Sequence, residues 1–283
     1  MNHKFFTPYP QNDSRTVPRG TAGGNRRVFL AALAGLLLLG CSSKRDESVL
    51  VVGMDLSYPP FETIDERGQP AGVSVEIARG LAQSLGRELR IENMPFVGLI
   101  PSLQNGRIDC VISSMTDTPE RRESIAFSDP YLTIGLAMLV GTKSEITDLA
   151  SLDRPDNVVV VRQGTTGEVW ARKAITRAKV LAVDKEGSAV LEVIQGKADA
   201  FVYDQMSVWQ NAQKHPAATR AILPPIQKEV WAIGVRKDDP ALLAAVNRFL
   251  AEFRKRGGFD ELGDRFLGEQ KKAFREEGIP FYF

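Results

Sequence analysis

Histidine and cysteine are scarce in this 283-residue chain, which contains two of each. The histidines are His3, in the first segment, and His215, on an expected surface helix, so neither is a plausible catalytic base. The cysteines are Cys41 and Cys110, too few for a disulfide framework. Cys110 lies in the apolar run 109–112, where we expect a buried thiol packed as a small hydrophobic side chain.

An excess of positive charge is also missing. The whole chain has 36 Lys and Arg against 35 Asp and Glu, a net charge of +1. Residues 1–40 hold five of the basic residues and one of the acidic ones, so the remainder has 31 positive and 34 negative charges, a net of −3. Nucleic-acid binding needs a basic face, so this mildly acidic body indicates no nucleic-acid partner.

The hydrophobic run at residues 28–39 is too short to span a bilayer, because its twelve residues fall well below the ~20 that a transmembrane helix needs. It follows Arg26-Arg27, which is typical of a signal peptide, and the arginines also resemble a twin-arginine export signal. Leu38-Leu39-Gly40-Cys41 resembles the bacterial lipobox, in which the cysteine is acylated and becomes the new N-terminus. A plain leader ending in Cys, exported by the general route, is the alternative.

These features predict three N-terminal parts. Residues 1–40 would be a lipoprotein signal peptide, Cys41 the lipid anchor, and 41–48 a polar tether. The expected location is therefore the periplasm or the cell surface, attached to a membrane by lipid.

Apolar runs alternate with helical patterns over the rest of the chain, and no repeat of 20–50 residues is present. This alternation predicts an α/β fold with largely parallel sheets. One helix is expected over 74–85, with Ser74 as N-cap and Gly86 as stop. The predicted strands are 49–53, 89–92, 110–113, 158–161, 180–183, 200–202 and 230–235, and the other helices are 99–104, 166–174, 188–195, 205–214, 240–256 and 259–266.

Two stretches rich in polar residues, Pro and charge, 141–157 and 215–229, are interpreted as links on either side of an inserted middle third. We therefore expect two lobes. Lobe 1 would be discontinuous, and lobe 2 would be the insertion; the predicted bounds are 49–134 with 232–283 for lobe 1 and 135–231 for lobe 2.

Polar segments follow several predicted strands, at the edge where α/β folds bind ligands. Asp55 and Tyr58 come after the first strand, in a turn made rigid by two prolines. The alternative is a structural turn with an aspartate cap and a packing tyrosine. Asp204 closes the strand at 200–202, where a carboxylate can meet a ligand ammonium, cap the next helix, or do both.

The run 113–131 is the most informative. Ser114 and Thr116 bring hydroxyl groups after a strand, and Arg121 follows with a guanidinium that can grip two oxygens of a carboxylate. A capped helix with surface arginines is the alternative, and it suits Arg122 better than Arg121. The run 162–168 places glycines and hydroxyls, Thr166 among them, at a helix start, but it lacks the lysine of a phosphate loop.

In this order the segments resemble the type 3 extracellular solute-binding proteins of ABC transporters, the family of polar amino-acid-binding proteins. The stretches that carry the resemblance are 55–61, 99–103, 113–131, 164–166 and 199–204. The resemblance implies a two-lobed periplasmic-binding-protein-like fold of type II with two crossover hinge strands, a ligand in the cleft, and a permease with its ATPase subunit as partners. A monomer is expected.

The resemblance also implies roles for particular residues. Arg121 would hold the α-carboxylate of an amino acid, with further donors from Ser114, Thr116 and Thr166, and Asp204 would take the α-ammonium. Tyr58 and Phe96 would enclose the ligand's side chain, beside Asp55. Arg162 stands where some relatives have Lys and others an apolar residue. A cation there favours a ligand with an uncharged or acidic side chain, such as glutamine or glutamate. Alternatively, Asp55 neutralises Arg162 or favours a basic ligand.

The rival hypothesis is an enzyme. Some secreted dehydratases that resemble cyclohexadienyl dehydratase share this fold and need an acid or base in the cleft. Glu62 and Glu168 are the remaining candidates here. The sequence predicts a binding protein rather than an enzyme, with neither a metal nor a cofactor.

Overall fold

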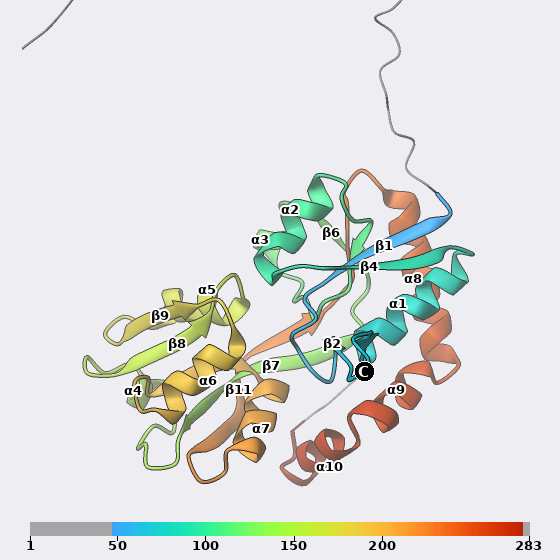
Figure 1. Cartoon of the computed structure of the whole chain (residues 1–283). Helices are drawn as coiled ribbons and strands as arrows, with labels where there is room; N and C mark the ends of the chain where they lie inside the picture. The colour runs from blue at the N-terminus through green and yellow to red at the C-terminus, as the bar shows by residue number, and fades with distance from the viewer. Residues whose placement is uncertain (1–46, 280–283) are drawn as a thin grey trace, which may run out of the picture. The chain divides into compact units, whose positions relative to one another are not determined.

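The computed structural model describes residues 47–279. These residues form two five-stranded sheets and a short hairpin, with helices packed around the sheets (Figure 1). The first sheet has the order β4-β1-β5-β12-β6 and the second the order β11-β7-β10-β8-β9. The predicted signal peptide, the predicted lipid anchor at Cys41 and most of the predicted tether fall outside the described residues.

The first sheet consists of β1 (Val49–Met54), β4 (Glu88–Asn93), β5 (Cys110–Val111), β6 (Ala126–Phe127) and β12 (Gly234–Val235). The second consists of β7 (Leu132–Gly141), β8 (Val158–Arg162), β9 (Lys179–Val183), β10 (Ala200–Asp204) and β11 (Thr219–Trp231), and the hairpin of β2 (Thr63–Ile64) and β3 (Pro70–Ala71). β1 pairs in parallel with β4 and β5, and β8 with β9 and β10, as the alternation predicts. Both sheets are nevertheless mixed and not largely parallel, because β12 pairs antiparallel with β5 and β6, and β7 pairs antiparallel with β10 and β11. The long strands β7 and β11 pair antiparallel and lead to and from the first sheet.

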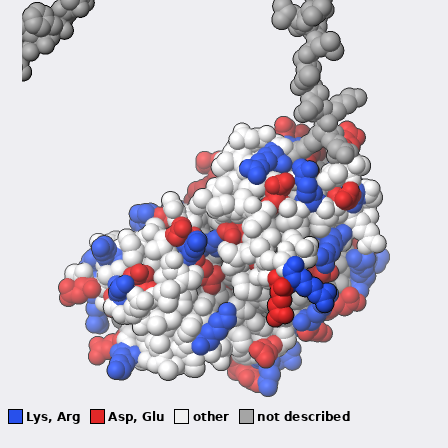
Figure 2. All heavy atoms as spheres, in the orientation of Figure 1, with Lys and Arg blue, Asp and Glu red and all other residues white. Residues whose placement is uncertain are grey.

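The helices are α1 (Val73–Ser84), α2 (Leu99–Gln104), α3 (Pro119–Arg122), α4 (Leu149–Leu152), α5 (Thr166–Ala174), α6 (Glu186–Ile194), α7 (Gln205–Lys214), α8 (Pro240–Lys255), α9 (Gly258–Phe266) and α10 (Gly268–Glu276), with a 3₁₀ turn η1 (Phe96–Gly98). None of the helices in 47–279 is long and apolar enough to cross a bilayer. On the face drawn in Figure 2, acidic and basic side chains are interspersed.

The central strands β1 and β8 are buried on two faces, which explains their continuous apolar sequences. On β1, Leu50 and Val52 pack in the cluster that contains α1 and α8, whereas Val51 packs in the cluster that contains α2. Successive side chains of a strand point to opposite faces, so one strand supplies two cores. Val160 and Val161 of β8 divide between two clusters in the same way. Cys110 is 0% exposed, which confirms its expected burial.

Three further sequence-based expectations were wrong. The segment 230–235 is not one strand, because the chain passes from β11 in the second sheet to β12 in the first. Most of the supposed link 215–229 lies in β11. Ser74 is not the N-cap of α1, which begins after Gly72; Ser74 is buried, and its hydroxyl donates to Glu62 at 2.6 Å.

Gly72 suits the start of α1 because its backbone has φ of 115°, a region that disfavours residues with a Cβ. A Cβ there would also lie 2.4 Å from the carbonyl oxygen of Phe61. The close approach holds the segment that follows β1 against the start of α1. That segment carries Tyr58 and Glu62 into the site described next.

Candidate functional site

A polar cavity lies where the ends of strands from both sheets meet. Every cleft residue predicted from the sequence lines it: Asp55, Tyr58, Phe96, Ser114, Thr116, Arg121, Arg162, Thr166 and Asp204. The loops after β1 and β5 contribute from the first sheet, and the ends of β8 and β10 contribute from the second. The geometry therefore brings the predicted residues together, while their roles toward a ligand stay predictions.

Asp204 is at the end of β10 and is 7% exposed. Its Oδ1 accepts a hydrogen bond from the Tyr58 hydroxyl at 2.6 Å and also caps α7, accepting from the N–H groups of Met206 and Ser207 at 3.0 and 3.1 Å. Burial raises the pKa of Asp204 to about 7, although the bond from Tyr58 opposes the rise. The capping role foreseen for Asp204 is confirmed, and it leaves Oδ2 for another partner.

Arg121 lies in the short helix α3, whose N-cap is Thr118. Its guanidinium donates to the carbonyl oxygens of Thr116 at 2.7 Å and Gly164 at 3.1 Å, so it joins the loop after β5 to the loop after β8. Burial lowers the pKa of Arg121, and attraction by Glu229 opposes that change. The guanidinium carbon is 5.3 Å from the centroid of the Phe96 ring, within the range of a cation–π contact.

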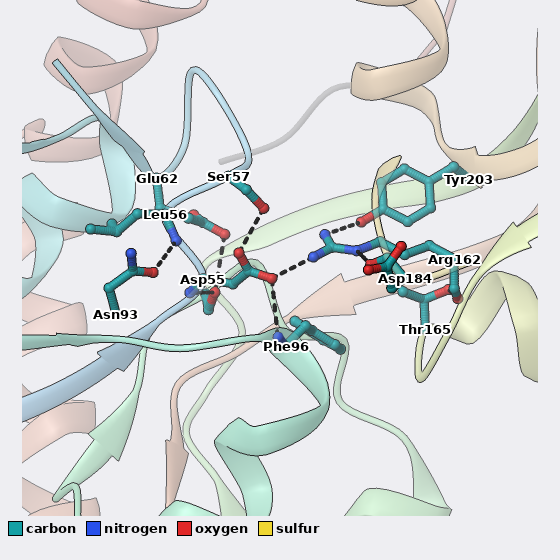
Figure 3. A network of polar contacts seen from close by, with 11 residues as sticks. Asp55, Leu56, Ser57, Glu62, Asn93, Phe96, Arg162, Thr165, Asp184 and Tyr203 are labelled. Atoms are coloured by element: carbon teal, nitrogen blue, oxygen red, sulfur yellow. Dashed lines mark hydrogen bonds and ion pairs between the residues drawn. The ribbon is translucent and has the colours of Figure 1, made fainter. Parts of the chain in front are cut away.

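Arg162 and Asp55 form a buried ion pair between the two sheets (Figure 3). Arg162 also donates to the Tyr203 hydroxyl at 3.3 Å and to the carbonyl of Asp184 at 3.4 Å. Burial alone would lower the pKa of Arg162, but the attraction of Tyr203 and Asp55 outweighs it and raises the pKa. Asp55 further accepts from the N–H of Phe96 at 3.0 Å, so the pair is fully built into the cavity wall.

The sequence left open whether Asp55 neutralises Arg162 or favours a basic ligand, and the ion pair bears on this choice. Because Arg162 binds Asp55 directly, each charge neutralises the other in this structure. Asp55 is then less able to select a cationic ligand side chain, and Arg162 keeps N–H groups beyond those used in the contacts above.

Sequence reasoning did not assign Glu62 to the binding site, although it kept it as a candidate acid. Glu62 is 1% exposed and lines the cavity, where it accepts from the hydroxyls of Ser74, Ser113 and Ser114 at 2.6, 3.3 and 3.1 Å. Burial raises the pKa of Glu62 to about 8 against these donors. The Ser114 hydroxyl, expected to donate to a ligand, donates here to Glu62. Glu168, the other candidate, binds Arg172 outside the cavity lining.

Glu229 on β11 was missed altogether because it lies in the stretch interpreted as a link. It is 5% exposed, and its Oε2 accepts from the hydroxyls of Thr116 at 2.9 Å and Thr166 at 3.0 Å. Gln227 donates to its other oxygen at 3.0 Å. Trp231 and Tyr203 also line the cavity without having been predicted, and each makes an edge contact with the ring of Tyr58.

The described part of the chain contains no group of three or more His, Cys, Asp or Glu side chains placed to hold a metal ion. The cavity instead combines two guanidinium groups, four carboxyl groups and several hydroxyls around an aromatic wall. Such a set can receive a small molecule that carries both a cation and an anion.

The family model for bacterial extracellular solute-binding proteins, family 3, matches residues 50–269. The chain belongs to this family. It is similar to the L-cystine-binding protein TcyJ of Escherichia coli (strain K12), with 28% identity over 254 residues that cover 86% of this chain and 96% of the relative.

Two solved structures are similar in fold and sequence. The P235GK mutant of ArgBP from T. maritima has a TM-score of 0.73 and 37% identity, covering 78% of this chain and 96% of that one. The ancestral amino acid-binding protein AncCDT-1, a precursor of cyclohexadienyl dehydratase, has a TM-score of 0.72 and 35% identity, covering 77% and 95%. The predicted two-lobed, type II periplasmic-binding-protein-like fold is therefore confirmed.

Proposed function

We propose that this member of family 3 is the substrate-binding component of an ABC uptake transporter and binds a polar amino acid in its cavity. The observation that carries the proposal is that two residues from different parts of the fold line one cavity. Arg121 lies in α3, between β5 and β6 of the first sheet, and Asp204 ends β10 of the second. A guanidinium and a carboxylate on opposite walls match the carboxylate and ammonium of a zwitterion. The family and the amino-acid-binding relatives support it.

Binding would proceed by closure of two lobes, 49–134 with 232–283 and 135–231. A ligand held by Arg121 on one lobe and Asp204 on the other makes contacts in the closed form that the open form lacks, so it shifts the population toward closure. The strands β7 and β11, which connect the two sheets, are the expected hinge. The permease and its ATPase subunit would then recognise the closed form.

For the ligand's side chain we favour an uncharged or acidic polar group. Phe96 and Tyr58 would enclose it, and Arg162 would offer its remaining N–H groups to a carbonyl or carboxylate oxygen. Asp55 already faces Arg162, which disfavours a second cation beside it. Glutamine and glutamate are therefore the first amino acids to test.

We further propose that the protein works as a monomer in the periplasm or at the cell surface. Residues 1–40 would direct export, and acylated Cys41 would hold the body to a membrane through residues 41–48. The apolar run 28–39 followed by Gly40-Cys41 supports this, and mass spectrometry of the N-terminal peptide tests it.

A second candidate function is a dehydratase. Glu62 favours it, because a carboxyl group whose pKa is raised to about 8 keeps its proton at neutral pH and can act as a general acid. Against this, its three contacts are serine hydroxyls that form part of the cavity wall. Incubation with prephenate or arogenate, followed by chromatography for turnover, distinguishes an enzyme from a binding protein.

The main proposal is tested by calorimetric titration with the proteinogenic amino acids and cystine. At least one should bind, and Arg121→Ala should weaken that binding by about 100-fold, ~2.7 kcal/mol, because it removes charge-assisted hydrogen bonds to the ligand carboxylate. Arg122→Ala is the matched control, since Arg122 pairs with Asp117 and does not line the cavity. Absence of any amino-acid binding, or equal effects of both variants, would refute the proposal.

A further inference from the structure

Glu229 occupies an unusual position for an acidic residue in a cavity expected to receive a carboxylate. It lies on β11, one of the two strands that connect the sheets, and is 5% exposed. Its Oε2 accepts from Thr116, which follows β5 of the first sheet, and from Thr166, which begins α5 beside the second. One oxygen of Glu229 therefore joins hydroxyls from both sides of the cavity.

These two hydroxyls are the ones expected to donate to the ligand's α-carboxylate. A threonine hydroxyl has one hydrogen to donate. While Thr116 and Thr166 donate to Glu229, neither can donate to a ligand. Glu229 also attracts the guanidinium of Arg121, the residue proposed to grip the same carboxylate. A carboxylate of the protein thus holds two of the four groups assigned to the ligand's carboxylate and attracts a third.

From this overlap we infer that Glu229 is a resident carboxylate, which occupies the position expected for the ligand's carboxylate and which the ligand must displace. Glu229 then lowers the affinity for the amino acid and restricts binding to ligands whose own carboxylate can replace it. The inference rests on the proposed function, since it concerns the same site. The carboxylates of Glu229 and of the ligand carry like charges and repel each other, so the same donors cannot bind both of them tightly at once.

The structure also offers a place for the displaced side chain. Thr116, Arg121, Thr166 and Glu229 line a second, more open groove of ≈ 1340 Å³ as well as the cavity. Gln227, which already donates to Oε1 of Glu229, lines that groove and is exposed. A rotation of the Glu229 side chain toward Gln227 would free both hydroxyls and bring the carboxylate to water.

The test compares amino acids with their α-carboxamides, which lack the negative charge. We would titrate L-glutamine, L-histidine and L-arginine, and L-glutaminamide, L-histidinamide and L-argininamide, into the full-length protein and its Glu229→Gln variant. Removing the resident charge should tighten amino-acid binding by about tenfold, equal to ~1.4 kcal/mol. Binding of the carboxamides should change much less. Glu123→Gln, which removes an exposed acid near Arg121 but outside the cavity lining, is the control and should change neither.

Weaker amino-acid binding by Glu229→Gln would overturn the inference, because Glu229 would then be a group that orients Thr116, Thr166 and Arg121 for the ligand. An equal gain for amino acids and carboxamides would also overturn it. Either result leaves the proposed function standing, since the wild-type protein still binds amino acids. No binding by both proteins would refute the proposed function and this inference together, whereas binding gained only in the variant supports the inference.

If Glu229→Gln does not fold, judged by circular dichroism, Glu229→Asp replaces it. Aspartate keeps the charge but is one methylene shorter, so it cannot hold both hydroxyls at their present distances of 2.9 and 3.0 Å. Amino acids should then bind more tightly than to the wild type. Weaker binding would contradict the displacement of Glu229.

Discussion

The affinity for an amino acid should depend on pH through Asp204. Burial raises the pKa of this carboxyl to about 7, so near neutral pH about half of the empty protein has it protonated. Only the ionised form can receive the ligand's ammonium group. Because the folded, empty protein binds the proton more tightly than a free aspartate does, lowering the pH should favour the proton over the ligand.

The size of the effect follows from the linkage between proton and ligand. Well below pH 7, each pH unit should weaken binding by about tenfold. Because half of Asp204 is already protonated at pH 7, the loss between pH 7 and pH 5 should be about 50-fold, or ~2.3 kcal/mol. The titrations are calorimetric, between pH 5 and 7.5, where the ligand's own α-amino and α-carboxyl groups keep their charges. An affinity that stays constant over this range would refute the assignment of Asp204 as the ammonium partner.

Two variants should move the midpoint of this pH dependence in opposite directions. Tyr58→Phe removes the hydrogen bond that lowers the pKa of Asp204, so the midpoint should rise. Glu186→Gln removes a nearby negative charge that raises the same pKa, so the midpoint should fall. Shifts of the same sign in both variants would mean that another group controls the dependence.

Three further predictions concern stability. In the folded protein Glu62 keeps its proton up to about pH 8, whereas in the unfolded chain it loses the proton near pH 4.5, so the free energy of unfolding should fall as pH rises between these values. Thermal unfolding at pH 5.5 and 8.5 should show a decrease on the order of 3–4 kcal/mol. The Glu62→Gln variant should lack this pH dependence. Arg162→Leu leaves the buried carboxylate of Asp55 without its partner and should lower the free energy of unfolding in urea by about 3–5 kcal/mol. Adding Asp55→Asn should restore stability, and a double variant that stays as unstable as Arg162→Leu would contradict the pairing. Gly72→Ala should cost about 1–3 kcal/mol from its φ of 115° alone, more with the contact to Phe61, and an unchanged melting temperature would contradict this.

Some segments with local start and stop signals were predicted to the residue. The helices Thr166–Ala174 and Gln205–Lys214 have the predicted bounds. Asp204 caps the second of these helices, and Pro216 follows its end. Thr165, in extended conformation, precedes the first. Such boundaries depend on neighbours in sequence, so sequence alone is enough to place them.

The connecting strands could not be found in this way. β7 is an apolar run of ten residues, longer than the short runs that indicate a buried strand and nearly as long as a buried helix, so the sequence pattern does not identify it as a strand. β11 contains Pro224-Pro225, and its pairing with β7 shifts register between Ile222 and Gln227. Proline and an irregular register are typical of a link, and only the long-range pairing with β7 makes this segment a strand.

Whether a cavity-lining residue was predicted from the sequence depends on the same distinction between local and long-range signals. Tyr58, Arg121 and Asp204 follow predicted strands, where α/β folds place ligand-binding groups. Glu229 lies within β11 and is surrounded in sequence by polar residues, as in a solvated link. Its function depends on hydroxyls more than 60 residues away, which no local pattern indicates.

The charges of the cavity suggest how the empty protein tolerates four buried acids beside two arginines. Each arginine attracts one carboxylate, and the two other acids, Glu62 and Asp204, are held by hydroxyl and N–H groups. Burial raises the pKa of both, so a proton can replace the missing cation on either. In the proposed binding mode a ligand's ammonium would supply that cation at Asp204, and binding should therefore release a proton. Titrations at pH 6.5 in buffers of different ionisation enthalpy should show this release, and heats that are independent of the buffer would contradict it.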